Sequence, residues 1–226
     1  GVDIIDIGGE STRPGALRIS PEEELERTLP VIKEISQLGI PLSIDTTRSE
    51  IAESAIKAGA TYVNDISGGL QDPRMAKVIA ANPQIQYIAM HWRGESKDMQ
   101  ERAIYRDVVS EVRSELEARV ESLIEQGVSA EQIILDPGIG FAKTGEHNWE
   151  LLRNIDRLQL LGFPVMVGAS RKRFLGELVG ATDPDARDTA SVAITTLMAR
   201  KGVWAVRTHS VKPHREAIQV VQELEA

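Results

Sequence analysis

The chain has 226 residues, 42% of them hydrophobic and 27% charged, which is close to the length of a single α/β barrel, and we treat 1–226 as one domain. The net charge of −8 argues against nucleic acid or an anionic membrane surface as partner, and no apolar run approaches the roughly 20 residues of a membrane-spanning helix. The absence of cysteine excludes disulfides and cysteine nucleophiles and agrees with a cytoplasmic setting, and the acidic opening GVDIIDIGGE is unlike a signal or transit peptide.

Short β-branched runs alternate with longer amphipathic ones along the chain. The predicted strands are 2–7, 41–45, 61–66, 86–91, 132–136, 164–168 and 204–209. Their apolar runs are nearly continuous, as in parallel strands covered on both faces. Two architectures fit such βα repetition: an open doubly wound sheet or a closed barrel. Seven strands of an eight-stranded barrel would leave two sheet edges without a pairing strand. We therefore expect a (β/α)8 TIM barrel whose first strand and helix are outside this sequence.

The predicted helices lie between these runs. Ser20, Pro21 and Glu23 predict a capping box, and Pro30 predicts a kink or a broken turn in the helix that follows. The longest helix is expected from about 105 to 126, ending before Gly127. Its apolar stripe is Val108, Val109, Val112, Leu116, Val120, Leu123 and Ile124. Later helices are expected near 148–161, 172–179, 188–201 and 214–225.

Polar side chains follow nearly every predicted strand where its apolar run stops. In parallel α/β folds, ligands bind beyond the carboxyl ends of the strands, so these side chains predict a single mouth with many convergent hydrogen-bonding groups. An Asp after a strand can instead be a helix N-cap. Capping does not explain Asp45, Asn64 and Asp136 at three separate strand ends, and we assign these to the site. Asp6 and Asp65 are open to a structural role, and we leave them out.

Basic side chains mark two further strand ends. Arg171 and Lys172 open a helix, where cations are mildly unfavourable, so the pair faces either an electron-rich ligand or solvent. Arg207 and His209 are two residues apart in the last strand and share one face. Because the arginine fork suits phosphate oxygens, we predict a phosphate site there in preference to a core histidine. The other histidines lack metal-ligand spacing: His91, His147 and His214.

Read in chain order, six segments resemble signatures of the dihydropteroate synthases. They are GGESTRPGA (8–16), SIDTTRSEIAESAIKAGATYVNDISGG (43–69), MHWRG (90–94), LDPGIGFAKTGEHNW (135–149), VGASRKRFLG (167–176) and RTHSV (207–211). One segment alone carries little weight. Six segments in the family's order, at barrel-strand spacing, cover essentially the whole chain and are highly specific.

The resemblance implies a transferase of folate synthesis. It would join 6-hydroxymethyl-7,8-dihydropterin pyrophosphate to p-aminobenzoate, giving 7,8-dihydropteroate and pyrophosphate. Asp45, Asn64 and Asp136 match the residues that read the pterin edge, which suits them because carboxylates accept pairs of N–H donors. Lys172 matches a lysine that bonds the carbonyl side of the pterin and belongs to the catalytic residues.

The remaining roles also come from the resemblance. Thr12, Arg13, Phe141 and Ser170 match the p-aminobenzoate site. Arg207 and His209 match the pyrophosphate anchor and are counted as catalytic. The implied chemistry is departure of pyrophosphate assisted by Mg²⁺, followed by attack of the neutral amine on a stabilised cationic methylene group. The family's metal ligand lies on a first loop, Asn-x-Thr-x-Asp-Ser-Phe, that this sequence lacks, so no metal ligand is assigned within the chain.

The resemblance also implies a homodimer through helices away from the mouth. Two departures from the family pattern are Ser210, where Asp is common, and Trp92, which we take as a subgroup variation. Three alternatives remain open. One is a methyltetrahydrofolate-binding methyltransferase, which would need no pyrophosphate anchor; another is a non-catalytic pterin-binding paralogue; the third is another phosphate-binding barrel enzyme. Lys172, Arg13 and Phe141 favour a catalyst.

Overall fold

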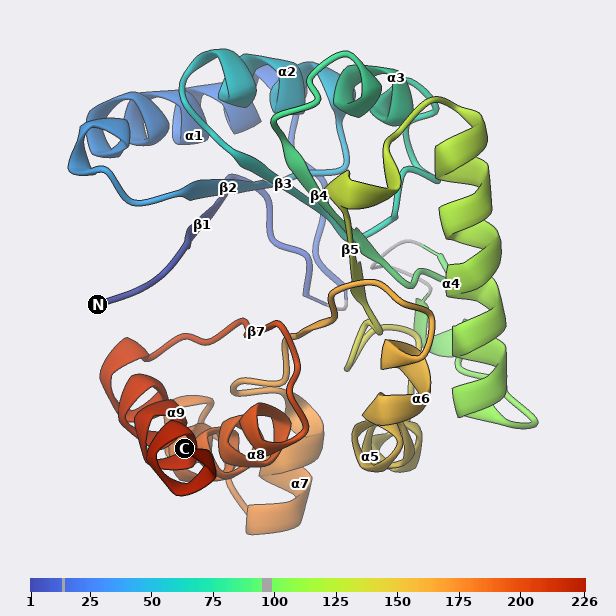
Figure 1. Cartoon of the computed structure of the whole chain (residues 1–226), viewed down its shortest axis with the longest axis vertical. Helices are drawn as coiled ribbons and strands as arrows, with labels where there is room; N and C mark the ends of the chain where they lie inside the picture. The colour runs from blue at the N-terminus through green and yellow to red at the C-terminus, as the bar shows by residue number, and fades with distance from the viewer. Residues whose placement is uncertain (14, 95–98) are drawn as a thin grey trace.

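The computed structural model describes residues 1–13, 15–94 and 99–226 (Figure 1). The strands are β1 (Ile5–Gly8), β2 (Leu42–Asp45), β3 (Tyr62–Asp65), β4 (Gln86–Met90), β5 (Ile133–Asp136), β6 (Met166–Val167) and β7 (Ala205–Val206). The α-helices are α1 (Pro21–Ile35), α2 (Ser49–Lys57), α3 (Met75–Ala80), α4 (Val108–Glu125), α5 (Gly145–Arg153), α6 (Ile155–Gln159), α7 (Arg173–Val179), α8 (Asp188–Arg200) and α9 (Val211–Glu225). Short 3-10 helices are η1 (Ser36–Leu38), η2 (Met99–Arg102), η3 (Ala130–Gln132) and η4 (Asp185–Arg187). A strand lies at each place that the sequence predicts.

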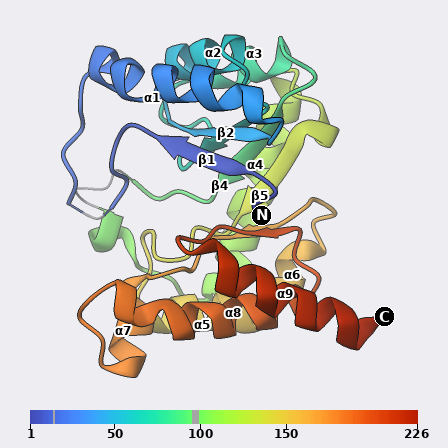
Figure 2. The same cartoon turned by 90° about the vertical axis from the view of Figure 1, so that its left-hand side faces the viewer.

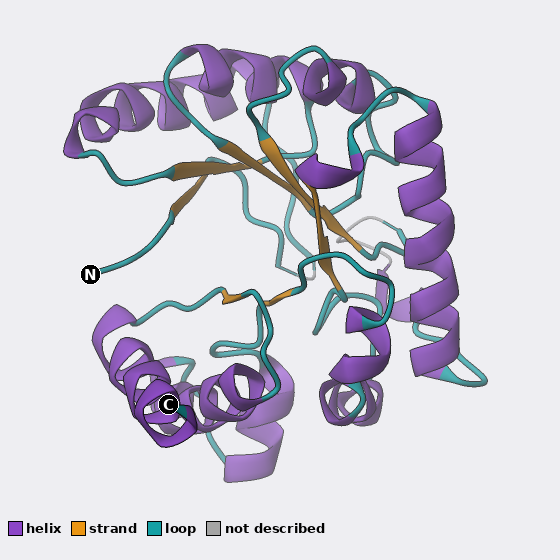
Figure 3. Ribbon diagram, in the orientation of Figure 1, coloured by secondary structure: helices purple, strands orange, loops and turns teal. Residues whose placement is uncertain are grey.

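The strands are parallel and follow one another in chain order. One sheet has the order β1-β2-β3-β4-β5, β6 pairs with β7, and a bridge between Leu135 and Val165 links the two sheets. In Figures 1 and 2, α1 to α4 lie beside the larger sheet and α7 to α9 gather beside the smaller one. The helices thus lie outside the strands, as the colours of Figure 3 make clear. Within the described ranges no ladder joins β7 to β1, so the structure is an α/β fold with curved parallel sheets.

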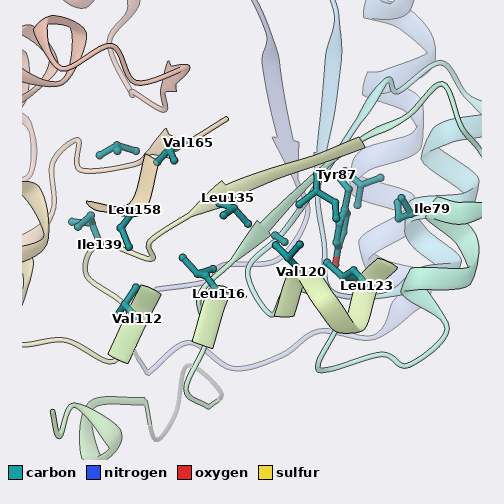
Figure 4. Close-up of a cluster of buried hydrophobic side chains, with 14 of the residues drawn as sticks. Ile79, Tyr87, Val112, Leu116, Val120, Leu123, Leu135, Ile139, Leu158 and Val165 are labelled. Carbon is teal, nitrogen blue, oxygen red and sulfur yellow. The ribbon is translucent and has the colours of Figure 1, made fainter. Parts of the chain in front are cut away.

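Alternation along the strands separates two sets of side chains. Residues pointing toward the helices form the main hydrophobic core, which includes Ile44, Val63, Tyr87 and Leu135 and is drawn in part in Figure 4. Residues pointing the other way form a second, smaller cluster: Ile88, Ile134 and Met166, with Tyr62 and Ala205 beside it. Two positions further along the same strands, on the same inner face, stand Asn64, Met90, Asp136, Gly168 and Arg207. The hydrophobic pattern of the strands therefore carries the predicted site residues to one inner face.

The helices agree with the sequence at most points. Ser20 caps α1 by accepting from the amide of Glu23, but no reciprocal cap bond forms because the Glu23 carboxylate pairs with Arg27. The helix runs through Pro30 without interruption, so the expected broken turn is wrong. The stripe of α4 is buried as predicted except for Ile124, which is 44% exposed near the helix end.

The helix expected at 148–161 is two helices, α5 and α6, which meet at Asn154, whose φ of −110° and ψ of 28° leave the helical range. Helices α7, α8 and α9 lie at the places expected from the sequence. Across the described part of the chain, no helix combines the length and the apolar character that crossing a membrane requires.

Candidate active site

The carboxyl ends of the strands bring together an arginine, two aspartates and an asparagine from opposite ends of the chain. Arg207 donates from Nε to Oδ2 of Asp6 at 2.6 Å and from Nη2 to Oδ2 of Asp45 at 3.0 Å. Asn64 donates from Nδ2 to the same oxygen of Asp6 at 3.3 Å. The structure therefore places three predicted site residues, Asp45, Asn64 and Arg207, in one connected group.

Asp6 was left out of the predicted site, and the structure places it at the centre of this group. Its Oδ2 accepts from both Arg207 and Asn64, and its Oδ1 is buried with no hydrogen-bond partner among the described residues. The alternation of side chains along the strand could have placed Asp6 in the site. Asp6 stands between Ile5 and Ile7, which face the helices, so the Asp6 side chain must face inward. Its neighbour in the ladder is Ser43, another inward position.

Asp65 points the other way and is structural. It is fully buried, and its carboxylate accepts from the amide and hydroxyl of Ser67, the amide of Gly69 and the hydroxyl of Tyr87. Each carboxylate oxygen therefore has partners within the fold. Its omission from the predicted site agrees with this arrangement.

Burial and neighbouring charge set the acidity of Asp45. Burial, together with the charge of Asp6 and opposed by Arg207, raises the pKa of Asp45 to about 7. The carboxyl group can accept hydrogen bonds when it is ionised.

Asp136, Lys172 and Arg207 surround a glycine on the inner face. A Cβ atom added to Gly168 would lie 3.7 Å from Cβ of Arg207, 3.9 Å from Oδ2 of Asp136 and 4.0 Å from Nζ of Lys172. Gly168 thus keeps open the space that these three side chains border. Burial raises the pKa of Asp136, and the charge of Lys172 lowers it. Gly168 was not predicted as a site residue, because the sequence does not distinguish it from a glycine that only allows the chain to turn.

Lys172 enters the mouth along the turn that follows β5. Its Nζ donates to the carbonyl oxygen of Ile139 and lies 4.6 Å from the ring centroid of Phe141. A Cβ on Gly140 would lie only 2.8 Å from Cδ of Lys172, so this position must be glycine for the lysine chain to pass. Burial lowers the pKa of Lys172 to about 8, and the charge of Asp136 opposes the fall. The predicted neighbours Lys172 and Phe141 are therefore in contact.

Arg171 and Lys172 are adjacent in the sequence, but their side chains point in different directions. Arg171 adopts a left-handed φ of 58° and turns outward to Asp185 and Asp188, with 2.7 Å between its Nε and Oδ1 of Asp188. Lys172 faces the mouth. The lysine therefore keeps the position from which it could face a ligand, whereas the arginine is part of an ion-pair cluster between α7 and α8.

Ser170 and His209 are joined by hydrogen bonds. Nδ1 of His209 lies 3.1 Å from the Ser170 hydroxyl oxygen, which also accepts from the His209 amide at 3.3 Å. Burial lowers the pKa of His209, and the charges of Arg207, Arg171 and Arg13 lower it further. Arg13 therefore lies near enough to His209 to affect its charge. The lowered pKa favours the neutral imidazole, which has one donor and one acceptor nitrogen.

The loop between β1 and α1 borders a cavity of about 220 Å³ next to Asp45. The cavity is lined by Thr12, Trp92 and eleven further residues: Glu10, Ser11, Ala16, Leu17, Arg18, Glu24, Asp45, Thr46, Thr47, Ile66 and Gln71. The loop is tied down by Arg48, which pairs with the buried Glu24 and with Glu10 and donates to the carbonyl of Ile19 at 2.7 Å. Thr12 and Arg13 thus lie on a loop whose two ends are fixed.

The remaining histidines have structural partners. His147 completes the capping box of α5 with Thr144, and Nδ1 of His214 lies 2.7 Å from the Thr195 hydroxyl. His91 is buried between Glu115 and Lys143. Across 1–13, 15–94 and 99–226, no group of three His, Cys, Asp or Glu side chains could hold a metal ion.

This set of groups suits a flat, nitrogen-rich ring joined to an anion. Asp45, Asn64 and Asp136 offer hydrogen-bond acceptors and an amide at the strand ends. Lys172 and Arg207 supply positive charge beside them, and Phe141 offers an aromatic face. Of the ten predicted site residues, only Thr12 and Arg13 are carried by a long loop, and the others lie at or just beyond the strand ends.

Comparison with known proteins assigns the family. A family model described as pterin binding enzyme matches residues 1–209. The chain is 48% identical to the dihydropteroate synthase of Mycobacterium leprae (strain TN), over 98% of this chain and 80% of that protein. The solved dihydropteroate synthase of Thermus thermophilus in complex with 4-aminobenzoate is 44% identical, with a TM-score of 0.92, covering 99% of this chain and 85% of that one. That of Xanthomonas albilineans in complex with 7,8-dihydropteroate is 36% identical, with a TM-score of 0.90, covering 100% and 80%. The chain therefore belongs to the pterin-binding enzymes and, within them, to the dihydropteroate synthases, which are transferases of folate biosynthesis.

Proposed function

We propose that the protein condenses 6-hydroxymethyl-7,8-dihydropterin pyrophosphate with p-aminobenzoate, giving 7,8-dihydropteroate and pyrophosphate. The observation that carries this is the border of Gly168, where Asp136, Lys172 and Arg207 converge, each within 4.0 Å of one point. One substrate molecule can therefore reach all three side chains. The carboxylate would bind the pterin ring, the lysine the ring carbonyl and the arginine the phosphate. The Xanthomonas albilineans relative in complex with 7,8-dihydropteroate supports the same product.

The pterin is read by Asp45, Asn64 and Asp136. A pterin edge presents adjacent N–H donors, and ionised carboxylates accept such pairs. Asp136 is oriented by the Gly138 amide, which donates to its Oδ1 at 2.7 Å and leaves Oδ2 toward Gly168. Lys172 borders the same space and bonds the carbonyl side of the ring.

p-Aminobenzoate occupies the wall formed by Phe141, Ser170, Thr12 and Arg13. Phe141 and Lys172 lie in contact, so the aromatic amine would stack next to the pterin methylene group. Arg13 is close enough to His209 to lower its pKa and can offer positive charge to the benzoate carboxylate. The Thermus thermophilus relative in complex with 4-aminobenzoate supports a site of this kind.

Pyrophosphate is anchored by Arg207 and His209. The bond between the pterin methylene carbon and the pyrophosphate oxygen breaks, and its electron pair leaves on oxygen, where the arginine fork offsets the growing charge. The amine nitrogen then supplies the electron pair of the new C–N bond and loses a proton to solvent. The chain itself contributes positioning of two reactants and charge, and it forms no covalent intermediate.

Mg²⁺ is proposed as the cofactor, yet the described residues do not build a site for it. They contain no cluster of three ligands, and the pyrophosphate anchor is a guanidinium and an imidazole. A magnesium ion is commonly held by substrate phosphates with one or two carboxylates, so it would depend mainly on the pyrophosphate oxygens. When bound, it would supply charge to the leaving group, and no step above is assigned to it.

The barrel and the assembly are also proposals. We infer that an eighth strand between β7 and β1 would close the sheet. Strands β7 and β1 are only partly buried, whereas β2 and β5 are buried throughout.

A homodimer is supported by an open apolar hollow of about 570 Å³ on α7 and α8, beside the exposed Leu178 and Leu197. A monomer in light scattering would remove it. The cytoplasm is the proposed location, in keeping with a chain without cysteine.

Calorimetry on the protein tests the function. A dihydropterin pyrophosphate analogue is titrated with and without Mg²⁺, p-aminobenzoate follows, and dihydropteroate formation is then measured. Binding that depends on the pyrophosphate group, followed by p-aminobenzoate binding and turnover, is expected. Pterin binding without a pyrophosphate contribution would favour a methyltransferase, and binding of both ligands without turnover would favour the non-catalytic paralogue.

A further inference from the structure

Lys143 is buried, with 2% of its surface exposed, and has no role in the mechanism above. Its Nζ lies 3.0 Å from Nδ1 of His91 and donates to the carbonyl oxygen of Phe141 at 3.1 Å. His91 is also buried, and its Nε2 lies 2.9 Å from Oε2 of Glu115. An amine, an imidazole and a carboxylate therefore form one chain beside the end of β5.

Donor and acceptor chemistry sets the protonation of this chain. An ammonium group has three donors and no acceptor, so a charged Lys143 requires Nδ1 of His91 to accept. Nε2 then carries the ring hydrogen and donates to Glu115. Burial and the charge of Lys143 lower the pKa of His91 to about 4, which agrees with a neutral ring. Each member then has a partner, with a positive end at the lysine and a negative end at the glutamate.

The chain is joined to Asp136 through the backbone. The His91 amide donates to the Asp136 carbonyl oxygen at 2.8 Å, and the Gly138 amide donates to the Asp136 carboxylate. A Cβ on Gly138 would lie 2.6 Å from the His91 carbonyl oxygen and 3.5 Å from Nζ of Lys143. Burial lowers the pKa of Lys143 to about 7, and the charge of Asp136 opposes the fall. The amino group lies against the turn that orients Asp136, where its positive charge, present below that pH, favours the ionised carboxylate.

The same lysine fixes the turn that carries Phe141. Ala142 has a φ of 47°, which is unusual for a residue with a Cβ and persists only where neighbours over-determine the backbone. Two side chains do so here. Lys143 holds the carbonyl of Phe141, and the Tyr105 hydroxyl donates to the carbonyl of Ala142 at 3.1 Å.

We propose that Lys143 is a positioning residue whose buried amino group supports the Asp136 carboxylate and holds the Phe141 turn, and so prepares the pterin and p-aminobenzoate sites together. This role rests on the proposed function. The charged groups that face Lys143 are Asp136 from β5, Glu115 from α4, Arg93 after β4 and Lys172 before α7. Those that face Asp136 are Lys172, Lys143 and Arg207.

The test separates the charge of Lys143 from its hydrogen bonds. Lys143→Met removes both, whereas Lys143→Gln retains a donor and removes the charge. The aspartate carboxyl carbons are labelled with ¹³C, and the Asp136 resonance is assigned with Asp136→Asn. In both variants the Asp136 titration should move roughly one pH unit higher, because a nearby positive charge is lost. The Asp45 titration should move less, because Asp45 lies at the end of β2, whereas Lys143 lies against the turn that follows β5 and Asp136.

Kinetics provide the second readout. Lys143→Met should raise KM for p-aminobenzoate about tenfold, since a buried carbonyl loses its donor, and Lys143→Gln should raise it less. Lys201→Met is the matched control, because Lys201 Nζ also donates to a backbone carbonyl, that of Arg153 at 2.9 Å, but on an exposed helix end. It should alter neither the carboxyl titration nor KM.

The outcomes distinguish this inference from the function on which it rests. An Asp136 titration that stays in place in both variants would overturn the role of Lys143, even in an active enzyme. If the Met variant does not fold, the Gln variant decides, because it must show the same displaced titration. A wild-type protein that makes no dihydropteroate would instead overturn the proposed function and, with it, any preparation of substrate sites by Lys143.

Discussion

Arg207 and Asp6 are 201 positions apart in the chain, and yet Nε of the arginine lies 2.6 Å from Oδ2 of the aspartate. The contact joins the end of the last strand to the first. It also gives the arginine a fixed orientation, because its Nη2 is held by Asp45 at the same time. A guanidinium held at two nitrogens keeps its remaining N–H groups directed in one way, which is the condition for recognising phosphate oxygens by geometry.

Asp6→Asn should therefore weaken binding of the dihydropterin pyrophosphate about tenfold, since one charged hydrogen bond to the arginine is lost. Binding of the pterin without pyrophosphate should change less. Removing the negative charge should also lower the pKa of Asp45, which Asp6 raises. Calorimetry with the dihydropterin pyrophosphate and with the pterin alone measures the two affinities. Asp3→Asn is the control, because Asp3 pairs with Arg215 on the exposed surface. Equal losses for both ligands would contradict the role of Asp6 as a support for Arg207.

Lys172→Ala and Asp136→Ala should abolish dihydropteroate formation with little change in thermal stability. Both side chains border the space beside Gly168 and belong to neither hydrophobic cluster. Removing a partly desolvated cation or carboxylate from a substrate site typically costs function far more than folding. Product formation and melting temperature are measured together. Wild-type turnover in either variant would remove these residues from the site.

The pH dependence of kcat/KM should be a narrow bell. Burial raises the pKa of Asp45 to about 7, so this carboxyl must lose its proton as pH rises before it can accept from the pterin. Burial lowers the pKa of Lys172 to about 8, so the positive charge is present below that pH and is lost above it. The rate should therefore rise through about pH 7 and fall through about pH 8. Lys172→Arg should lower the rate, because Gly140 leaves little room beside the side chain of residue 172. The alkaline fall of the remaining rate should move to higher pH, because arginine stays charged. A fall at an unchanged pH would assign it to another group.

Gly168→Val should block pterin binding by filling the pocket. The nearest atoms to an added Cβ are between 3.7 and 4.0 Å away, so a single methyl group fits but a branched side chain enters the substrate space. The expected loss of affinity is about tenfold to a hundredfold, the size of other steric overpacking effects. Gly168→Ala is the control and should bind nearly as wild type. Unchanged affinity in the valine variant would show that the ring lies elsewhere.

Arg48→Met should destabilise the fold by about 3 kcal/mol, since it leaves a buried glutamate without its partner. Glu24 is 1% exposed and pairs with Arg48, which also holds Glu10. Lys57→Met is the control, since the Lys57 and Glu53 pair is exposed on α2 and should matter little. Denaturant unfolding compares the two. An equal effect of the two substitutions would mean that the Arg48 cluster does not fix the loop.

The sequence predicted the strands well because their apolar runs are long enough to be recognised. It also predicted that polar side chains meet at their ends, since carboxyl ends of parallel strands lie at one edge. Two kinds of contact were beyond it. Asp6 could be placed by alternation, but its bond to Arg207 depends on how far the sheet curves. The cluster of Lys143, His91 and Glu115 depends on how α4 packs against β4 and β5, and no local pattern encodes that.

The helix predictions failed where local preference competed with tertiary contacts. Glu23 had the right spacing for a capping box but found Arg27 one turn further on. Ile124 matched the apolar stripe of α4, but the helix ends at the next residue and leaves it outside the core. Ser210 occupies the N-cap position of α9, where Asp is equally favoured, so the departure from the family pattern falls on a capping position.

The left-handed backbone at Arg171 makes the order of two neighbouring cations decisive. Exchanging them, with Arg171→Lys and Lys172→Arg, would conserve charge, composition and nearly all volume. At position 172, the exchange would bring a planar guanidinium group close to Gly140, where the lysine methylene chain now lies. At position 171, it would replace the guanidinium group that pairs with Asp185 and Asp188 by a single ammonium group. This turn therefore distinguishes two residues that share a sign of charge, and a shift of the chain by one residue would be as damaging as the loss of either side chain.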